Sequence, residues 1–216
     1  MDTKGKVFYF LGDSITEGHG ATTNEECYVT RFYNANPGSI VHNYGIGGTR
    51  IAPQRTPSVS ARHDLDFIKR AGEMDDRADV VFVFGGTNDY GHGDAPFGKF
   101  GDETPDTFCG ALRFLTVKLL NKYPDKTIVF ITPLHRISED NGALNSPDKK
   151  RLVDYVLEIR KNAEYFSLPV IDLWANSGMQ PNVDAINKTY FIDGLHPNDK
   201  GYEKIFNIIN NFVKAL

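Results

Sequence analysis

The stretch VVFVFGGTND, residues 80–89, holds five consecutive apolar residues that give way at once to two glycines and a polar segment. An unbroken apolar run of this length is typical of a strand in a parallel sheet, which helices cover on both faces. Residues 127–132 read TIVFIT and show nearly the same pattern. The two runs together predict a parallel sheet within an α/β fold.

Three further runs of apolar, β-branched or aromatic residues lie outward from these two, at residues 7–11, 39–43 and 169–173. Helical patterns separate the expected strands, at residues 25–33, 60–70, 107–122, 146–165 and 198–216. Because strands alternate with helices, we expect right-handed crossovers and helices on both faces of one sheet. The length of 216 residues suits a single domain, residues 1–216.

Charge and hydropathy argue against several classes of partner. Lys and Arg number 24 against 28 Asp and Glu, a net charge of -4, so no basic excess favours nucleic acid. No apolar run approaches the ~20 residues of a membrane-spanning helix, so no membrane insertion is expected. Residues 1–6 are polar and lead into a strand, not a signal peptide, which predicts a cytoplasmic location. Cys27 and Cys109 are expected to be buried free thiols.

Polar, glycine-rich segments follow the expected strands, at the edge where parallel sheets bind ligands. The first apolar run ends in Gly12-Asp13-Ser14. A serine hydroxyl becomes a useful nucleophile beside a base, and the preceding glycine permits a tight turn. The alternative is that Asp13 or Ser14 only caps a helix.

His196 is the candidate base, because an imidazole can accept a proton near neutral pH and return it. Asp193 precedes it by three residues, so in a tight turn its carboxylate can bond to Nδ1 and orient the ring. The alternative is that Pro197 and Asn198 begin a helix and His196 only lies beside that start.

Acyl transfer also requires donors for the oxyanion of the transition state. The candidates are the backbone N–H groups of Ser14 and Gly48 and the side-chain amide of Asn88. Gly48 has the alternative of a glycine that lets a helix approach, and Asn88 that of an Asx-type turn.

Four segments, taken in order, resemble the conserved blocks of the SGNH hydrolases, also called the GDSL lipase/esterase family. Residues 12–15 (GDSI) resemble the nucleophile block, and residues 43–49 resemble the second block, with Gly48 at the oxyanion position. Residues 86–89 (GTND) match the G-x-N-D block and residues 193–196 (DGLH) the D-x-x-H block. The resemblance spans essentially the whole chain.

The resemblance implies a flavodoxin-like, three-layer α/β/α fold with a five-stranded parallel sheet. It also implies ester hydrolysis through an acyl-enzyme on Ser14, with Asp193 and His196 and without metal or cofactor. The sequence departs from the family in having Ile15 where the name-giving motif has Leu. Gly47 and Thr49 also flank Gly48 where many relatives carry a small polar residue and Asp.

Loops at the same edge of the sheet should select the substrate. Residues 90–105 form a long, glycine-rich loop with acidic and aromatic side chains, and residues 133–136 follow the fourth strand. These segments favour a small-molecule ester with a short acyl group, such as acetyl, on a carbohydrate alcohol. The expected substrate contacts are Asp13, Asp89, Tyr90 and His135.

Three alternatives remain beside this hypothesis. One is a lysophospholipase or lipase of the same family, and another is a non-catalytic carbohydrate-binding protein on this scaffold. The third is a metal site built from Asp89, His92 and Asp94. The sequence leaves the acyl chain, the alcohol and the oligomeric state open.

Overall fold

The computed structural model describes residues 1–216 and contains one parallel sheet of five strands, in the order β2-β1-β3-β4-β5. Every strand pair is parallel, and β1 pairs with both β2 and β3. The strands are β1 Val7–Gly12, β2 Ile40–Gly45, β3 Val80–Phe84, β4 Thr127–Ile131 and β5 Val170–Ile171. The expected five-stranded parallel sheet is confirmed.

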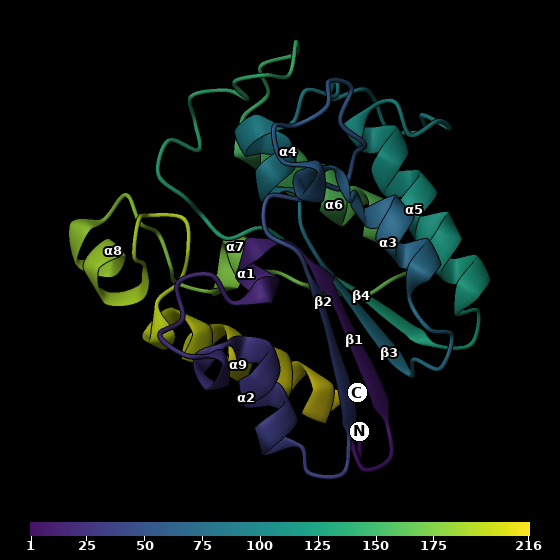
Figure 1. Cartoon of the computed structure of the whole chain (residues 1–216), viewed down its shortest axis with the longest axis vertical. Helices are drawn as coiled ribbons and strands as arrows, with labels where there is room; N and C mark the ends of the chain where they lie inside the picture. Colours follow the sequence, from purple (N-terminus) through teal and green to yellow (C-terminus); the bar gives the residue numbers. More distant parts are fainter.

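Helices cover both faces of this sheet, as Figure 1 shows, with α2 and α9 on one side and α3, α5 and α6 on the other. Their bounds are α2 Tyr28–Ala35, α3 Phe67–Glu73, α5 Phe108–Lys122, α6 Leu152–Tyr165 and α9 Asp199–Ala215. Four short helices lie outside these layers: α1 Ser14–Glu17, α4 Thr87–His92, α7 Leu173–Asn176 and α8 Asp184–Tyr190. The three-layer α/β/α fold is therefore confirmed.

The alternation of side chains along β1 divides the interior into two cores. Phe8 and Phe10 point into a cluster of 21 buried residues beneath α2 and α9. Tyr9 and Leu11 point into a cluster of 28 buried residues beneath α3, α5 and α6. Because both faces are apolar, the central strands β1, β3 and β4 read as nearly continuous apolar runs, which is why residues 80–84 predicted a buried strand.

Helix ends follow local capping by polar side chains. The Asn198 side chain accepts N–H bonds from Lys200 and Gly201 at the start of α9, both at 3.1 Å. The Thr107 hydroxyl accepts the Gly110 N–H at the start of α5. Such caps satisfy the free N–H groups of a first helical turn.

Several expected boundaries were wrong, and two of them have a local cause. The helix expected at 60–70 is split, because Asp66 accepts the Lys69 N–H and begins α3 at Phe67. The strand expected at 169–173 is short, because Asp172 caps α7. The helix expected at 146–165 begins at Leu152. The loop expected from residue 90 begins after α4, which ends at His92.

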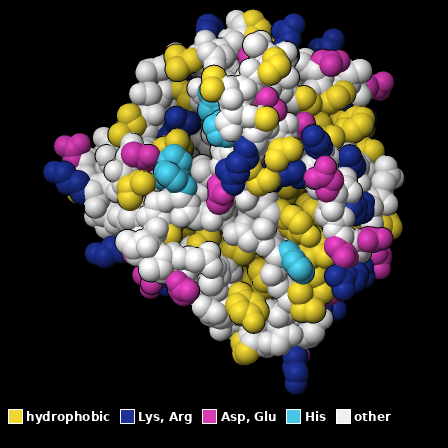
Figure 2. Space-filling model, in the orientation of Figure 1, with side chains coloured by type: hydrophobic (Ala, Val, Ile, Leu, Met, Phe, Trp, Pro, Cys, Tyr) yellow, Lys and Arg dark blue, Asp and Glu magenta, His cyan; other side chains and the backbone are white.

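Both cysteines are buried and unpaired, as expected. None of the helices combines the length and the apolar character needed to cross a membrane. On the face drawn in Figure 2, basic and acidic side chains are interspersed, without an extended patch of one sign.

Candidate active site

The turn from β1 into α1 presents Ser14 at the carboxyl edge of the sheet. Asp13 caps α1 by accepting the Ile15 N–H at 3.0 Å, so the capping alternative holds for Asp13 and is compatible with a reactive Ser14. A side chain at Gly12 would lie 1.9 Å from the Thr16 hydroxyl. The Gly-Asp-Ser sequence thus reflects a turn that has no space for a larger first residue.

Ser14, His196 and Asp193 form a continuous hydrogen-bonded chain. Ser14 Oγ lies 3.0 Å from His196 Nε2, and His196 Nδ1 lies 2.7 Å from Asp193 Oδ2. A carboxylate can only accept, so Nδ1 carries the proton and Nε2 is left to accept from the serine. The fold thus brings Ser14 into contact with His196, 182 positions further along the chain. The three residues lie in the order of nucleophile, base and orienting group.

The loop that carries the base is braced by its own backbone. Asp193 Oδ1 accepts the N–H groups of Leu195 at 2.9 Å and His196 at 2.7 Å. Gly194 between them has a φ of 79°, a left-handed conformation that glycine adopts at little cost. Ile192 donates its N–H to the His196 carbonyl, and Asn198 begins α9 just beyond. His196 thus lies beside a helix start and is also held against Ser14.

The electrostatic surroundings keep His196 neutral and Asp193 ionised. Burial lowers the pKa of His196 below its usual value, against the opposing effect of Asp193, and the charges of His19 and Arg136 lower it further. For Asp193, burial acts to raise the pKa, but the bonds from His196 and the backbone outweigh it, and the pKa is lowered. A neutral imidazole beside an ionised carboxylate is the state in which a histidine can accept a proton.

A glycine turn after β2 lies directly against Ser14. A side chain built at Gly47 would come within 3.5 Å of the Ser14 Cβ, and Gly48 has a φ of 75°. The Gly47 N–H donates to Glu17 Oε2 at 2.7 Å, which orients the turn, whereas the Gly48 N–H has no partner in the protein. The His63 ring lies over Gly48, where a Cβ would approach it to 2.6 Å.

Asn88 lies in the first turn of α4, on the other side of this turn. Its amide nitrogen donates to the Thr49 carbonyl at 3.0 Å, which leaves its second N–H without a partner. The amide thus ties α4 to the glycine turn and does not form an Asx turn. The Ser14, Gly48 and Asn88 donors named from the sequence therefore lie on adjoining segments.

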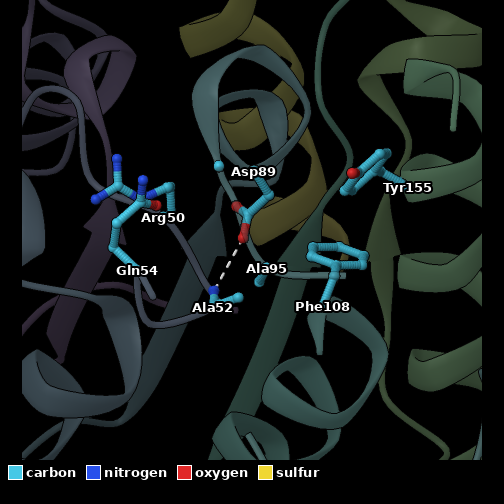
Figure 3. Close-up of a pocket in the computed structure, with 8 residues that line it drawn as sticks. Arg50, Ala52, Gln54, Asp89, Ala95, Phe108 and Tyr155 are labelled. Carbon is cyan, nitrogen blue, oxygen red and sulfur yellow. Dashed lines mark hydrogen bonds between the residues drawn. The ribbon is translucent and has the colours of Figure 1, made fainter. Parts of the chain in front are cut away.

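Two of the four expected substrate contacts are buried and bonded to the backbone. Asp13 and Asp89 are only 1% and 4% exposed, and both bond to backbone N–H groups. Figure 3 shows Asp89 directed at the loop after β2, where it accepts the Ala52 N–H. Asp89 also accepts the Ile51 N–H at 3.0 Å. These carboxylates hold their loops in place, and burial raises the pKa of Asp13 to about 7 and of Asp89 to about 6. Their contact with substrate stays a prediction.

Tyr90 is also buried, whereas His135 is partly exposed, and both have partners that the sequence did not indicate. The Tyr90 hydroxyl donates to the Ser138 carbonyl. His135 Nδ1 lies 3.0 Å from the Glu139 carboxylate, and its ring packs on Trp174 with ring centres 3.7 Å apart. Their contact with substrate stays a prediction.

The residues of the alternative metal site are each engaged elsewhere. Asp89 bonds to the backbone after β2, and Asp94 accepts the N–H groups of Arg55 and Thr56 at 2.7 Å. His92 Nδ1 accepts from Arg50, and burial together with this cation lowers the pKa of His92 to about 4. The three side chains do not converge on one point.

Sequence reasoning gave no role to three residues of this region, although it placed one of them, Arg136, in a loop facing the site. Glu17 orients the glycine turn, and His19 makes an edge contact with the His196 ring, with ring centres 4.3 Å apart. Arg136 influences the pKa of His196 through its charge. The GDSITE run placed Glu17 close to Ser14, but nothing local in the sequence showed that its carboxylate meets a turn 30 residues away.

A parallel sheet with a serine, a histidine and an aspartate joined at its carboxyl edge is the arrangement of an α/β acylhydrolase. Comparison with known proteins places the chain more narrowly. The GDSL-like lipase/acylhydrolase family matches residues 10–204, and the chain belongs to this family. It is therefore a hydrolase of the kind that acts on esters. No curated protein sequence matches the chain.

Solved structures share the fold of this chain. A protein from Lactobacillus plantarum is 30% identical, with a TM-score of 0.82 and 98% of each chain covered. A lipase/acylhydrolase from Enterococcus faecalis is 21% identical, with a TM-score of 0.67, 97% of this chain and 96% of that one covered, and it shares the fold. A two-domain esterase active on acetylated mannans is 24% identical, with a TM-score of 0.61, and the match covers 97% of this chain and 48% of that one.

Proposed function

We propose that the chain is a serine esterase that hydrolyses short acyl esters, above all acetyl esters of a carbohydrate alcohol, through an acyl-enzyme on Ser14. One observation carries the proposal: the hydrogen-bonded chain from Ser14 Oγ to His196 at 3.0 Å and on to Asp193 at 2.7 Å. We also propose that residues 1–216 act as one domain, because both cores share one sheet.

In the first half of the reaction, Ser14 Oγ attacks the ester carbonyl carbon while its proton passes to His196 Nε2. Asp193 holds the ring in the required tautomer and stabilises the imidazolium that forms. The negative charge on the former carbonyl oxygen is met by the N–H groups of Ser14 and Gly48 and by the Asn88 amide. Such donors act mainly on the transition state, where the charge develops.

Collapse of the tetrahedral species breaks the bond to the alcohol, which leaves with the proton from His196 Nε2. The acyl group is then bonded to Ser14 Oγ. A water molecule donates its proton to His196 and attacks the acyl carbon, and the same donors receive the oxyanion. The carboxylic acid leaves, and the proton returns to Ser14.

The preference for short acyl groups is supported by the surroundings of the site. The cavity lined by Tyr90 and Arg136, next to the candidate site, measures about 180 Å³. The resemblance to an esterase active on acetylated mannans favours an acetylated sugar. A second candidate, an acylhydrolase for longer chains, is favoured by Ile137 and Leu144, apolar side chains that remain exposed at the same cavity.

A panel of esters separates the two candidates. The kcat/KM values for p-nitrophenyl acetate, butyrate, octanoate and palmitate should fall with acyl length, and acetate should be released from acetylated mannose. Ser14→Ala is the control for hydrolysis elsewhere on the protein. A higher kcat/KM for octanoate or palmitate would reject the short-chain proposal in favour of a lipase or lysophospholipase.

A further inference from the structure

Arg136, which follows β4, is a half-buried cation without a carboxylate partner. Its Nη1 donates to the Thr87 carbonyl at 3.2 Å and hydroxyl at 3.3 Å, and its guanidinium lies 5.5 Å from the centre of the Tyr90 ring. Its Nε is buried and has no partner, and Nη2 donates to nothing in the protein. A charge removed from water is costly unless an opposite charge or further acceptors meet it, so this guanidinium retains unused binding capacity.

The neighbouring carboxylates are not free to neutralise it. Glu139 accepts from His135, from Gln180 and from the backbone N–H of Arg136 itself. Asp193 is engaged by His196 and by two backbone N–H groups. Asp13 caps α1. Each of these groups has its own partners, and none forms an ion pair with the guanidinium.

The free side of Arg136 lines a cavity of about 180 Å³. Tyr90 and Arg136 supply one part of its wall, Ser138 and Asn141 supply further polar groups, and Ile137 and Leu144 supply the apolar part. Since a water molecule occupies about 30 Å³ in the liquid, the space suits a group of several non-hydrogen atoms. The cavity is thus suited to a small anionic group on a short carbon chain.

Gly91, in α4, makes room for this arrangement. A Cβ built there would lie 2.8 Å from Arg136 Nη1 and 3.6 Å from both Cζ and Nη2. Any side chain at this position would push the guanidinium out of its place against α4. Gly91 therefore leaves the space that the Arg136 guanidinium occupies.

The cavity adjoins the candidate active site on two sides. Thr87, which holds Arg136, immediately precedes Asn88, and the Ile137 N–H donates at 2.9 Å to the carbonyl of Gly194, between Asp193 and His196. The charge of Arg136 also contributes to the lowered pKa of His196. A substrate bound at Ser14 could therefore place a nearby group beside Arg136.

We propose that Arg136 and its cavity bind a carboxylate carried by the ester substrate, and so select anionic esters over neutral ones. This proposal rests on the esterase function proposed above and narrows its substrate class to esters of acids or sugars that carry a second, ionised carboxyl group. A carboxylate would accept a charge-assisted hydrogen bond from Nη2, which has no partner in the protein. Its negative charge would offset the cost of burying the arginine.

Two pairs of esters test the proposal and show which side of the ester carries the anion. The first pair is 4-acetoxybenzoate and its methyl ester, which differ in charge on the alcohol side. The second pair is p-nitrophenyl hemisuccinate and p-nitrophenyl butyrate, which differ in charge on the acyl side. For each pair, kcat/KM is measured for wild type, Arg136→Gln and Arg136→Lys, with the exposed Arg151→Gln as a matched control on the same loop.

In at least one pair, Arg136→Gln should lower kcat/KM for the anionic ester at least tenfold more than for its neutral partner, mainly through KM. Arg136→Lys, which keeps the charge but not the planar fork, should fall between, and Arg151→Gln should behave as wild type. Equal losses on both members of both pairs would give Arg136 a purely structural role and overturn the proposal. Emission of Trp174, the only tryptophan, reports whether each variant retains the fold around His135.

Direct binding keeps the test independent of the reaction. Calorimetric titration with succinate and with benzoate should show heat of binding for the wild type that Arg136→Gln abolishes. If the wild type hydrolyses none of the esters, the proposed function fails, and the calorimetry alone decides the carboxylate site. Absence of binding in the wild type, together with no preference in either ester pair, would reject the site.

Discussion

Two histidines in this molecule bond through Nδ1 to a carboxylate a few residues away in the sequence. His196 pairs with Asp193, three residues before it, at 2.7 Å, and His135 pairs with Glu139, four residues after it, at 3.0 Å. Their local chemistry is nearly the same, and both lie at the carboxyl edge of the sheet. From sequence, either could serve as an oriented base.

The two pairs differ in what lies on the other side of the ring. In the first pair, His196 Nε2 faces the Ser14 hydroxyl. In the second pair, the His135 ring packs on Trp174, and its partner Glu139 also accepts from Gln180 and from the Arg136 backbone N–H. The first pair ends at a group that can react. The second pair ties together the loop after β4 and the segment after α7. The comparison shows that a carboxylate-oriented imidazole becomes a base only where its free nitrogen meets a nucleophile.

The largest effect should separate the two histidines. His196→Ala should lower kcat/KM for p-nitrophenyl acetate by up to about 10⁴-fold, because the serine loses its proton acceptor. His135→Ala should change it by less than about tenfold and instead destabilise the fold by about 1–2 kcal/mol, through lost packing on Trp174. Thermal unfolding and Trp174 emission report the second effect. Comparable losses of activity in the two variants would break the comparison.

Removing Asp193 should also lower activity more than removing Glu139, but the loss should be smaller than in His196→Ala. Asp193→Ala should lower kcat/KM on the order of 10³-fold, because the base remains but loses its orientation, and the double variant with His196→Ala should be scarcely worse than His196→Ala alone. Glu139→Ala is the matched control and should mainly lower the melting temperature. Additive losses in the double variant would show that Asp193 and His196 do not act as a unit.

Asn88→Ala should lower kcat on the order of 100-fold with little change in KM, because an oxyanion donor acts when charge develops. The side chain also donates to the Thr49 carbonyl, so circular dichroism must show an intact fold. A rise in KM at constant kcat would assign Asn88 to binding of the ground state.

The smallest expected effect concerns pH. Because burial and the charges of His19 and Arg136 lower the pKa of His196, kcat/KM should rise with pH through an inflection below the usual value of about 6.5. His19→Ala removes one of these charges, so the imidazolium is less disfavoured and the inflection should move upward, while activity at pH 8 stays within about twofold. An inflection that moves downward in His19→Ala would contradict this electrostatic account.

The fold was largely predictable because its three central strands, β1, β3 and β4, are buried on both faces and therefore read as apolar runs, as at residues 80–84. The short helices were less so. α4 contains Gly91 and the polar residues Asn88 and Asp89, and its stability depends on tertiary bonds from Asp89 to the loop after β2. Propensity alone does not predict such a helix.

The candidate site divides in the same way. Asp193 and His196 lie three residues apart, so their pairing could be expected from the sequence. The backbone partners of Asp89 and the lone guanidinium of Arg136 could not, because each depends on which distant backbone groups the fold brings near. A carboxylate after a strand looks the same in sequence whether it meets substrate or two buried N–H groups.

The most direct test of the central claim is to trap the acyl group on Ser14. A fluorophosphonate probe should add to the wild type at neutral pH, and peptide mass spectrometry should place the adduct on Ser14. Labelling should be lost in Ser14→Ala, slowed strongly in His196→Ala and nearly unchanged in His135→Ala. Labelling that persists in Ser14→Ala, or that lies on another residue, would contradict the account.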